Sequence, residues 1–271
     1  MCSGWMTAPF ARWNDEEPMP RIRLIIQYDG TEYVGWQTQP NGVAVQEVIE
    51  KELQKLTGVR PVLHASGRTD SGVHALAQVA HFDTDSRIPA EKFCYALNVG
   101  LPRDIRILHS DGAEGFHSRF DVIKKHYRYT VNNGLHAGAF DRNTALHYHY
   151  HLDENKMQRA ADALLGRHDF AAFKSTGTDL ESTVRTIYSA NWSREGNTLR
   201  FDISGSGFMY NMVRIIVGTM LEIGSGRREE SSIAKAIESK SRSDAGATAP
   251  AHGLMLYRVE YPDLDTINFA R

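Results

Sequence analysis

The 271-residue chain has very little cysteine, since Cys2 and Cys94 are its only two. Two cysteines cannot build a disulfide framework, which excludes a disulfide-stapled secreted scaffold and favours a cytoplasmic protein. Long hydrophobic runs are also missing. The most apolar segment, residues 208–223, contains charged side chains and is too short to cross a bilayer, so no membrane anchor is expected. The N-terminus lacks the continuous apolar region of a signal peptide.

The chain also lacks an excess of positive charge. Its 31 Lys and Arg residues are outnumbered by 33 Asp and Glu residues, which gives a net charge of −2. Any nucleic-acid-binding surface must therefore be local. With 41% hydrophobic residues, a chain of this length can bury a sizeable core in one large or two smaller domains.

Hydrophobic periodicity predicts two successive mixed units. The first unit contains strands at 22–28, 79–82 and 105–108, and helices at 45–56, which ends at Gly58, and at 93–97. The second unit contains strands at 126–131, 187–192, 199–203 and 254–261, and helices at 210–223 and 231–238. The strands at 187–192 and 199–203 flank a turn centred on Gly196, which predicts a hairpin. A further helix is capped by Asp153, carries an apolar stripe and ends at Gly166; the stripe comprises Met157, Ala160, Ala161, Leu164 and Leu165.

This order predicts an α+β fold of two ferredoxin-like halves with mainly antiparallel sheets. We expect an N-terminal half at residues 21–121 and a C-terminal half at 122–271. Residues 1–20 are expected to be a disordered extension, because they lack periodicity and end in an acidic, proline-containing run.

The densest cluster of small polar residues is the segment 66–74, SGRTDSGVH. Gly67 and Gly72 permit tight turns and a close approach of backbone to a ligand. Arg68 lies two residues before Asp70, so we expect it either to keep that carboxylate ionised, by lowering its pKa, or to bind a phosphate. Taken alone, the segment is more typical of a surface turn with an ion pair, because turns favour these residue types.

The same segment resembles the signature of TruA-type tRNA pseudouridine synthases. Five further blocks resemble this family and follow its order between about residues 22 and 262. They are YDGTEYVGWQ (28–37), FHSRF (116–120), KHYRY (125–129), FMYNMVRIIVG (208–218) and GLML (253–256).

The resemblance implies a pseudouridine synthase fold and a catalytic carboxylate at Asp70, with Arg68 beside it. It implies that Tyr127 packs on the target base, that Arg214 lies by the catalytic Asp, and that Leu254 forms part of the base pocket. It further implies a homodimer that acts on uridines 38, 39 and 40 of the tRNA anticodon stem-loop. Isomerisation of uridine is redox-neutral, so we expect neither a cofactor nor a metal.

The RNA backbone requires cations, and the segment 124–129 is the best candidate because cations and aromatic rings interleave there. We therefore expect Lys124, Lys125 and Arg128 to bind the substrate. Weaker candidates are scattered along the chain: Arg119, Arg142, Lys174, Arg227 and Arg228.

His147, His149 and His151 alternate, so a strand would place all three on one face. This pattern admits a metal site. However, no cysteine or carboxylate lies among these residues, and a solvated strand face is the favoured interpretation.

Two other classes of function stay open from the residues alone. A non-catalytic RNA-binding module would use a ferredoxin-like sheet with surface aromatics, although the expected aromatic RNP motif is missing. A hydrolase would use Asp70 as one of two carboxylates, although no second acid accompanies it within the segment 66–74.

Overall fold

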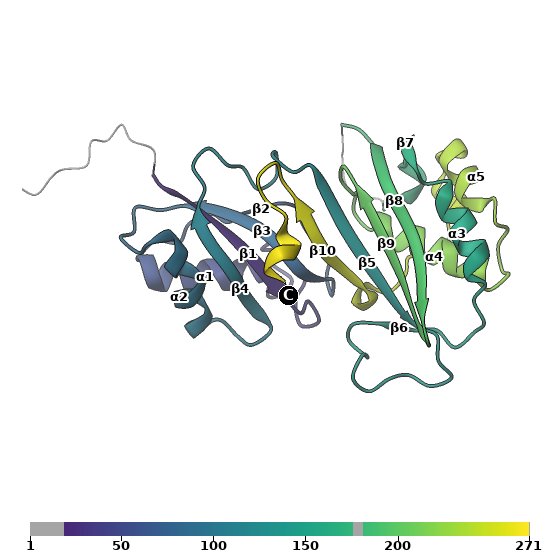
Figure 1. The fold of residues 1–271 in the computed structure, drawn as a ribbon, viewed down its shortest axis with the longest axis horizontal. Helices are drawn as coiled ribbons and strands as arrows, with labels where there is room; N and C mark the ends of the chain where they lie inside the picture. Colours follow the sequence, from purple (N-terminus) through teal and green to yellow (C-terminus); the bar gives the residue numbers. More distant parts are fainter. Residues whose placement is uncertain (1–18, 176–180, 271) are drawn as a thin grey trace, which may run out of the picture.

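The computed structural model describes residues 19–175 and 181–270. Most of the predicted disordered extension, residues 1–18, lies outside this part of the chain. One mixed sheet runs through the length of the molecule in the order β4-β1-β3-β10-β5-β9-β8-β7, with β2 paired to β3 and β6 paired to β5. Figure 1 shows α1 and α2 beside one end of this sheet and α3, α4 and α5 beside the other.

The N-terminal elements follow the predicted β-α-β-α-β order, with one short strand, β2, in addition. They are β1 (Arg21–Tyr28), α1 (Val45–Thr57), β2 (His64–Ala65), β3 (His74–Asp83), α2 (Phe93–Gly100) and β4 (Ile105–Gly112). Leu24, Ile25 and Ile26 of β1 are fully buried, since this strand lies between β3 and β4. Helix α1 buries its predicted apolar face and ends at Gly58, whose φ of 80° is readily adopted only by glycine.

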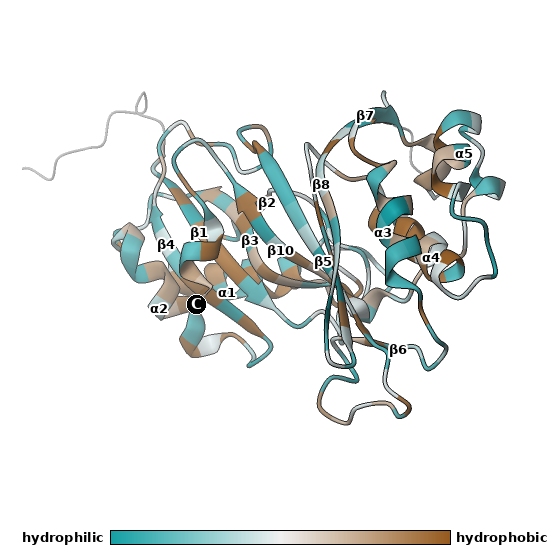
Figure 2. Ribbon diagram, turned by 45° about the vertical axis from the view of Figure 1, so that its right-hand side comes forward, coloured by the Kyte–Doolittle hydropathy of each residue, from teal (hydrophilic) through white to brown (hydrophobic). Residues whose placement is uncertain are grey.

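The C-terminal elements contain the predicted hairpin and long helix. They are β5 (Lys124–Asn132), β6 (Leu146–His147), α3 (Glu154–Asp162), β7 (Gly166–Asp169), β8 (Val184–Glu195), β9 (Thr198–Gly205), α4 (Met212–Gly224), α5 (Ser232–Ser239) and β10 (Leu254–Glu260). Helix α4 is buried on almost every side, and Figure 2 shows its largely hydrophobic ribbon beside α3. In the described residues, no helix is long and apolar enough to span a membrane.

Strand β10 joins the two parts of the chain. It pairs in parallel with β3, through Met255 opposite His74, and antiparallel with β5, through Leu256 opposite Tyr127. The fold is the predicted α+β arrangement, with the two ferredoxin-like halves fused into one continuous sheet. The division at residues 121/122 stays a proposal, because the last strand of the C-terminal half completes the sheet of the N-terminal half.

Two local predictions were wrong. Helix α3 ends at Asp162, and a tight turn follows in which the N–H of Leu165 donates to the carbonyl of Asp162, so Leu165 is exposed rather than part of the apolar stripe. Strand β6 is only two residues long, so His147, His149 and His151 do not share a strand face. Nε2 of His147 instead bonds the carbonyl oxygen of Gly134 at 3.0 Å.

Candidate active site

The Asp70 loop, defined here as residues 66–73, connects β2 to β3 and is held from below by buried polar contacts. The side-chain amide of Gln78 donates to the carbonyl of Gly67 at 2.9 Å, and the Ser66 hydroxyl bonds Oε1 of Gln78 at 2.5 Å. The hydroxyls of Tyr28 and Thr69 lie 2.7 Å apart. Because these groups are buried, the loop cannot move without leaving polar atoms unsatisfied.

The segment that follows β1 packs directly against the backbone of this loop. The N–H of Trp36 donates to the carbonyl of Thr69 at 3.1 Å. Close approach requires glycine: a Cβ at Gly30 would lie 2.1 Å from the carbonyl oxygen of Val73, and one at Gly35 would lie 2.6 Å from that of Thr69. The block at residues 28–37 therefore supports the loop that carries Asp70.

Asp70 lies at the N-terminus of α4. Its Oδ2 is 3.6 Å from Nη1 of Arg214, and both side chains are only 17% exposed. The backbone N–H of Asn211, the residue that precedes α4, donates to the Asp70 carboxylate. Arg214 is held in turn by the carbonyl of Ala249 and by Oδ1 of Asn211, each at 2.7 Å. The positive end of the helix dipole adds to the attraction for a negative charge at this point.

Burial raises the pKa of Asp70, and the charge of Arg214 with the N–H of Asn211 offsets part of that rise. The prediction that Arg68 lowers the pKa of Asp70 was wrong. Thr69 between them is buried, while the side chain of Arg68 is exposed and is not among the groups that act on the pKa of Asp70. The counterion of Asp70 comes from α4, more than a hundred residues along the chain.

Tyr127 lies in β5, only 8% exposed, with its ring 5.2 Å from that of Phe208 in an edge-to-face arrangement. Burial and the nearby charge of Asp70 raise the pKa of its hydroxyl. Leu254 is also buried and begins the neighbouring strand, opposite Tyr129. The structure thus brings a carboxylate and an aromatic side chain together at the junction of the two halves.

The three cations predicted to bind substrate have different environments. Lys124 lies 3.7 Å from Glu260, and Arg128 forms an ion pair with Asp202 at 2.7 Å, so both are neutralised by acids. Lys125 projects from the other face of β5 and donates to the carbonyl of Ser66 at 2.5 Å. Burial and two neighbouring arginines lower the pKa of Lys125 to about 8.

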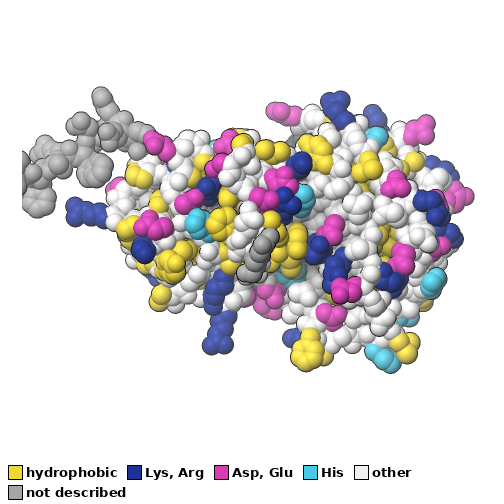
Figure 3. Space-filling view, in the orientation of Figure 1, with side chains coloured by type: hydrophobic (Ala, Val, Ile, Leu, Met, Phe, Trp, Pro, Cys, Tyr) yellow, Lys and Arg dark blue, Asp and Glu magenta, His cyan; other side chains and the backbone are white. Residues whose placement is uncertain are grey.

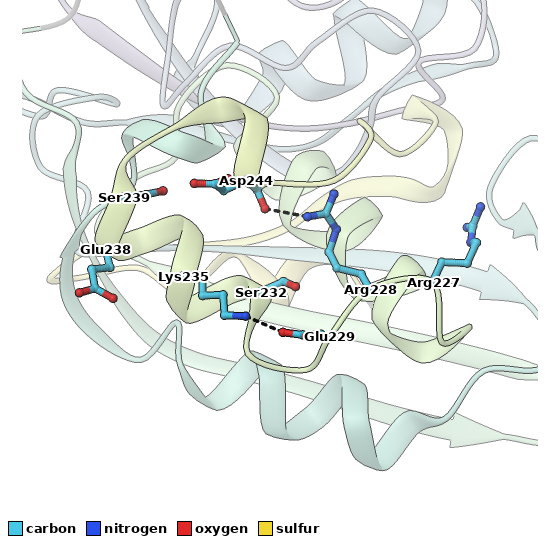
Figure 4. A pocket seen from close by; sticks show the side chains of 8 residues that line it. All are labelled: Arg227, Arg228, Glu229, Ser232, Lys235, Glu238, Ser239 and Asp244. Carbon is cyan, nitrogen blue, oxygen red and sulfur yellow. Dashed lines mark hydrogen bonds and ion pairs between the residues drawn. The ribbon is translucent and has the colours of Figure 1, made fainter.

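A hollow of about 740 Å³ near α5 collects two other predicted cations, Arg227 and Arg228 (Figure 4). It is not the Asp70 site. Arg228 forms an ion pair with Glu222 at 2.9 Å, and Lys235 pairs with Glu229. Because opposite charges neutralise each other there, the hollow has no evident preference for an anion. In the part of the chain that the structure describes, no cluster of three or more His, Cys, Asp or Glu residues is arranged to hold a metal ion.

Comparison with known proteins identifies the family. A family model described as tRNA pseudouridine synthase matches residues 24–121 and 160–262. The chain belongs to the tRNA pseudouridine synthase family. Proteins named tRNA pseudouridine synthase A are 48% identical in Acetivibrio thermocellus and 49% identical in Ruminiclostridium cellulolyticum, each over 90% of this chain and 100% of the relative. The relative of that name from Bacillus subtilis is 46% identical over 89% of this chain and 99% of its own length.

Sequence reasoning assigned no role to Asn211 or Phe208, although both lie in the block at residues 208–218. Asn211 has a positive φ of 61°, donates its N–H to Asp70 and positions Arg214. A signal was present in the sequence, because Asn211 precedes Arg214 by three residues, the spacing of neighbours on a helix. The contact of Phe208 with Tyr127 joins the segment after β9 to β5 and had no such local signal.

Proposed function

We propose that this protein converts uridine to pseudouridine at positions 38, 39 and 40 of the tRNA anticodon stem-loop, with Asp70 as the catalytic carboxylate. One observation carries the assignment of Asp70. In a member of this family, the carboxylate is mostly buried, lies 3.6 Å from the Arg214 guanidinium at the start of α4, and adjoins the ring of Tyr127.

The reaction breaks the N1–C1′ bond, turns the uracil and rejoins C5 to C1′. The hydrogen on C5 is then lost as a proton, and N1, which no longer bonds the sugar, takes up a proton. Atoms and electrons balance without a redox partner. A single ionised carboxylate near C1′ and C6 can serve as the nucleophile or stabilise the positive charge that develops on the sugar. Arg214 and the N–H of Asn211 support this chemistry, because they favour the ionised form of Asp70 in a site where burial opposes it.

The base must leave the helix to reach a buried carboxylate. We propose that the ring of Tyr127 replaces part of the lost base stacking, which is worth about 1–3 kcal/mol per base. Leu254 supplies an apolar wall beside it. Arg68 is exposed on the same loop as Asp70, where it is available to fill the space that the base vacates or to contact a phosphate.

A homodimer is part of this proposal. A single elongated sheet is a narrow platform for an L-shaped tRNA, and a symmetric second copy would extend it. Sedimentation that shows only monomer at micromolar concentration would count against the dimer and would leave the catalytic assignment intact.

A hydrolase with two carboxylates is disfavoured. In the described residues, the groups that act on the pKa of Asp70 are Arg214 and Asn211, with no second acid among them. A glycosidase-type site requires a second carboxyl group within roughly 5–10 Å of the first.

The experiment is tritium release from tRNA labelled at C5 of uridine, followed by mapping of pseudouridine in the product. We expect release with the wild-type chain and none with Asp70→Asn or Asp70→Ala. The matched control is Asp85→Asn, since Asp85 is exposed and lies beyond the end of β3. Binding without release by the wild type would indicate an RNA-binding module, and free uracil would indicate a hydrolase.

A further inference from the structure

Three cations converge beside the Asp70 loop: Lys125 of β5, Arg185 of β8, and Arg119 of the connection between β4 and β5. Lys125 pairs with Gly205 of β9, which on its other side pairs with Ile187 of β8, two residues from Arg185. Both guanidinium groups also act electrostatically on the Lys125 ammonium. The polar contacts of Lys125 and Arg185 are with backbone carbonyls, those of Ser66 for Lys125, and Ser182 and Val184 for Arg185. Among the described residues, none of the three forms an ion pair with a carboxylate.

This lack of acids sets the cluster apart from Lys124, Arg128 and Arg21 of the same sheet. Lys124 pairs with Glu260, Arg128 with Asp202, and Arg21 with Asp83. On the face drawn in Figure 3, Lys and Arg side chains are likewise interspersed with Asp and Glu. Three like charges held together without a counterion repel one another, so the arrangement favours the arrival of an anion.

The cluster borders both sides of the proposed active site. On one side, Lys125 Nζ lies against the Asp70 loop, where a Cβ on Gly67 would come within 2.7 Å of it. On the other side, Arg185 Nε is 3.7 Å from the place that a Cβ on Gly207 would occupy. Gly207 precedes Phe208, whose ring packs on Tyr127.

We propose that Lys125, Arg119 and Arg185 form a phosphate-binding site that holds the RNA backbone next to the uridine being isomerised. The inference rests on the proposed function and deepens it by assigning the cations that contact the flanking phosphate. Lys125 has two donor positions left after its bond to Ser66, and guanidinium groups bind phosphate oxygens through several N–H groups. Flipping a base turns the backbone around its flanking phosphates, so a clamp at that point helps to hold the flipped conformation.

The test combines protein and RNA changes. The RNA is an anticodon stem-loop with one neutral methylphosphonate linkage on the 5′ or the 3′ side of the target uridine. The proteins are the wild-type chain, Arg119→Gln and Arg185→Gln, neither of which removes the bond from Lys125 to Ser66. The matched control is Lys92→Gln, an exposed cation beside α2 with no ion pair to an acid among the described residues.

We expect one of the two neutral linkages to weaken binding by the wild type about tenfold. Each arginine variant should bind unmodified RNA more weakly, and its slope of log K against log salt should be shallower by about 0.7–0.9 for each phosphate that is no longer neutralised. The neutral linkage should then cost each variant less than it costs the wild type, because one of the cations that bind this phosphate is absent. Lys92→Gln should behave like the wild type in all of these measurements.

Two results would overturn the proposal. One is a loss of affinity, for an arginine variant with the neutral linkage, that equals the product of the two separate losses. The other is a salt slope that stays unchanged in the arginine variants. Lys125→Met separates a purely structural role. If Lys125 only holds the loop, this variant loses turnover and keeps its full sensitivity to the neutral linkage, which contradicts the phosphate site. Tritium release identifies failure of the proposed function separately, because it is measured on unmodified tRNA with the wild-type chain.

Discussion

Replacing Arg214 by Met should make turnover depend on pH between about pH 6 and pH 8, a range in which we expect the wild-type rate to change little. Burial already raises the pKa of Asp70, and Arg214 is the first of the groups that counteract it. Without the guanidinium, protonation of the carboxylate begins at higher pH, and the protonated form can neither attack nor stabilise positive charge. The rate should therefore fall as the pH decreases through the pKa of Asp70, and this fall should start closer to neutrality in the variant.

The structure sets the scale of this effect. Opposite charges 3.6 Å apart attract by about 4–5 kcal/mol in an effective dielectric of about 20. This is an upper value, since water replaces part of the missing guanidinium. Each 1.36 kcal/mol corresponds to a factor of about ten in the ionisation equilibrium. We therefore expect the ratio of turnover at pH 8 to turnover at pH 6 to rise by about tenfold in Arg214→Met.

The assay is single-turnover tritium release at saturating enzyme between pH 5.5 and 9, which separates chemistry from binding. Arg214→Lys is the matched control, because it keeps the charge but cannot form the paired bonds to Ala249 and Asn211. It should have a lower maximal rate with a pH profile close to that of the wild type. A pH profile of Arg214→Met that is lower but unchanged in shape would refute the role of Arg214 as the counterion of Asp70.

Three other changes test the site. Asp70→Asn should abolish turnover with little loss of tRNA affinity. Folding raises the pKa of Asp70, so the ionised carboxylate destabilises the folded protein near neutral pH. Asp70→Asn should therefore melt at a higher temperature than the wild type at pH 7, and the difference should vanish below about pH 4. Tyr127→Leu should lose about 1–3 kcal/mol of binding free energy in a titration with RNA. Tyr127→Phe should bind RNA normally, and its single-turnover rate should fall roughly 10²–10⁴-fold if the hydroxyl transfers a proton. A Phe variant with the normal rate would reduce Tyr127 to a stacking surface. Gly30→Ala should lower the free energy of unfolding by roughly 1–3 kcal/mol in a urea titration, because its Cβ would lie 2.1 Å from the Val73 carbonyl oxygen. An unchanged midpoint of the urea transition would contradict the tight packing of residues 28–37 on the Asp70 loop.

The sequence alone determined the elements with a strong local pattern. The apolar spacing in α1 and the glycine at 58 predicted a helix and its end, because a helix forms and stops through contacts between near neighbours. The same holds for the β8–β9 hairpin with its turn at Gly196. The density of small polar residues at 66–74, together with the family blocks, also pointed to Asp70.

Only the tertiary structure decided which charges meet. Arg68 is two residues from Asp70 and points into solvent, while Arg214 is distant in sequence and supplies the counterion. Likewise, Lys124 and Lys125 are adjacent in sequence, but strand alternation sends one to Glu260 and the other to the Asp70 loop. A local pattern records which side chains share a face of one element. Ion pairing and burial depend on which elements then pack together, and β10, the last strand, inserts between β3 and β5 to bring Tyr127 to the Asp70 loop.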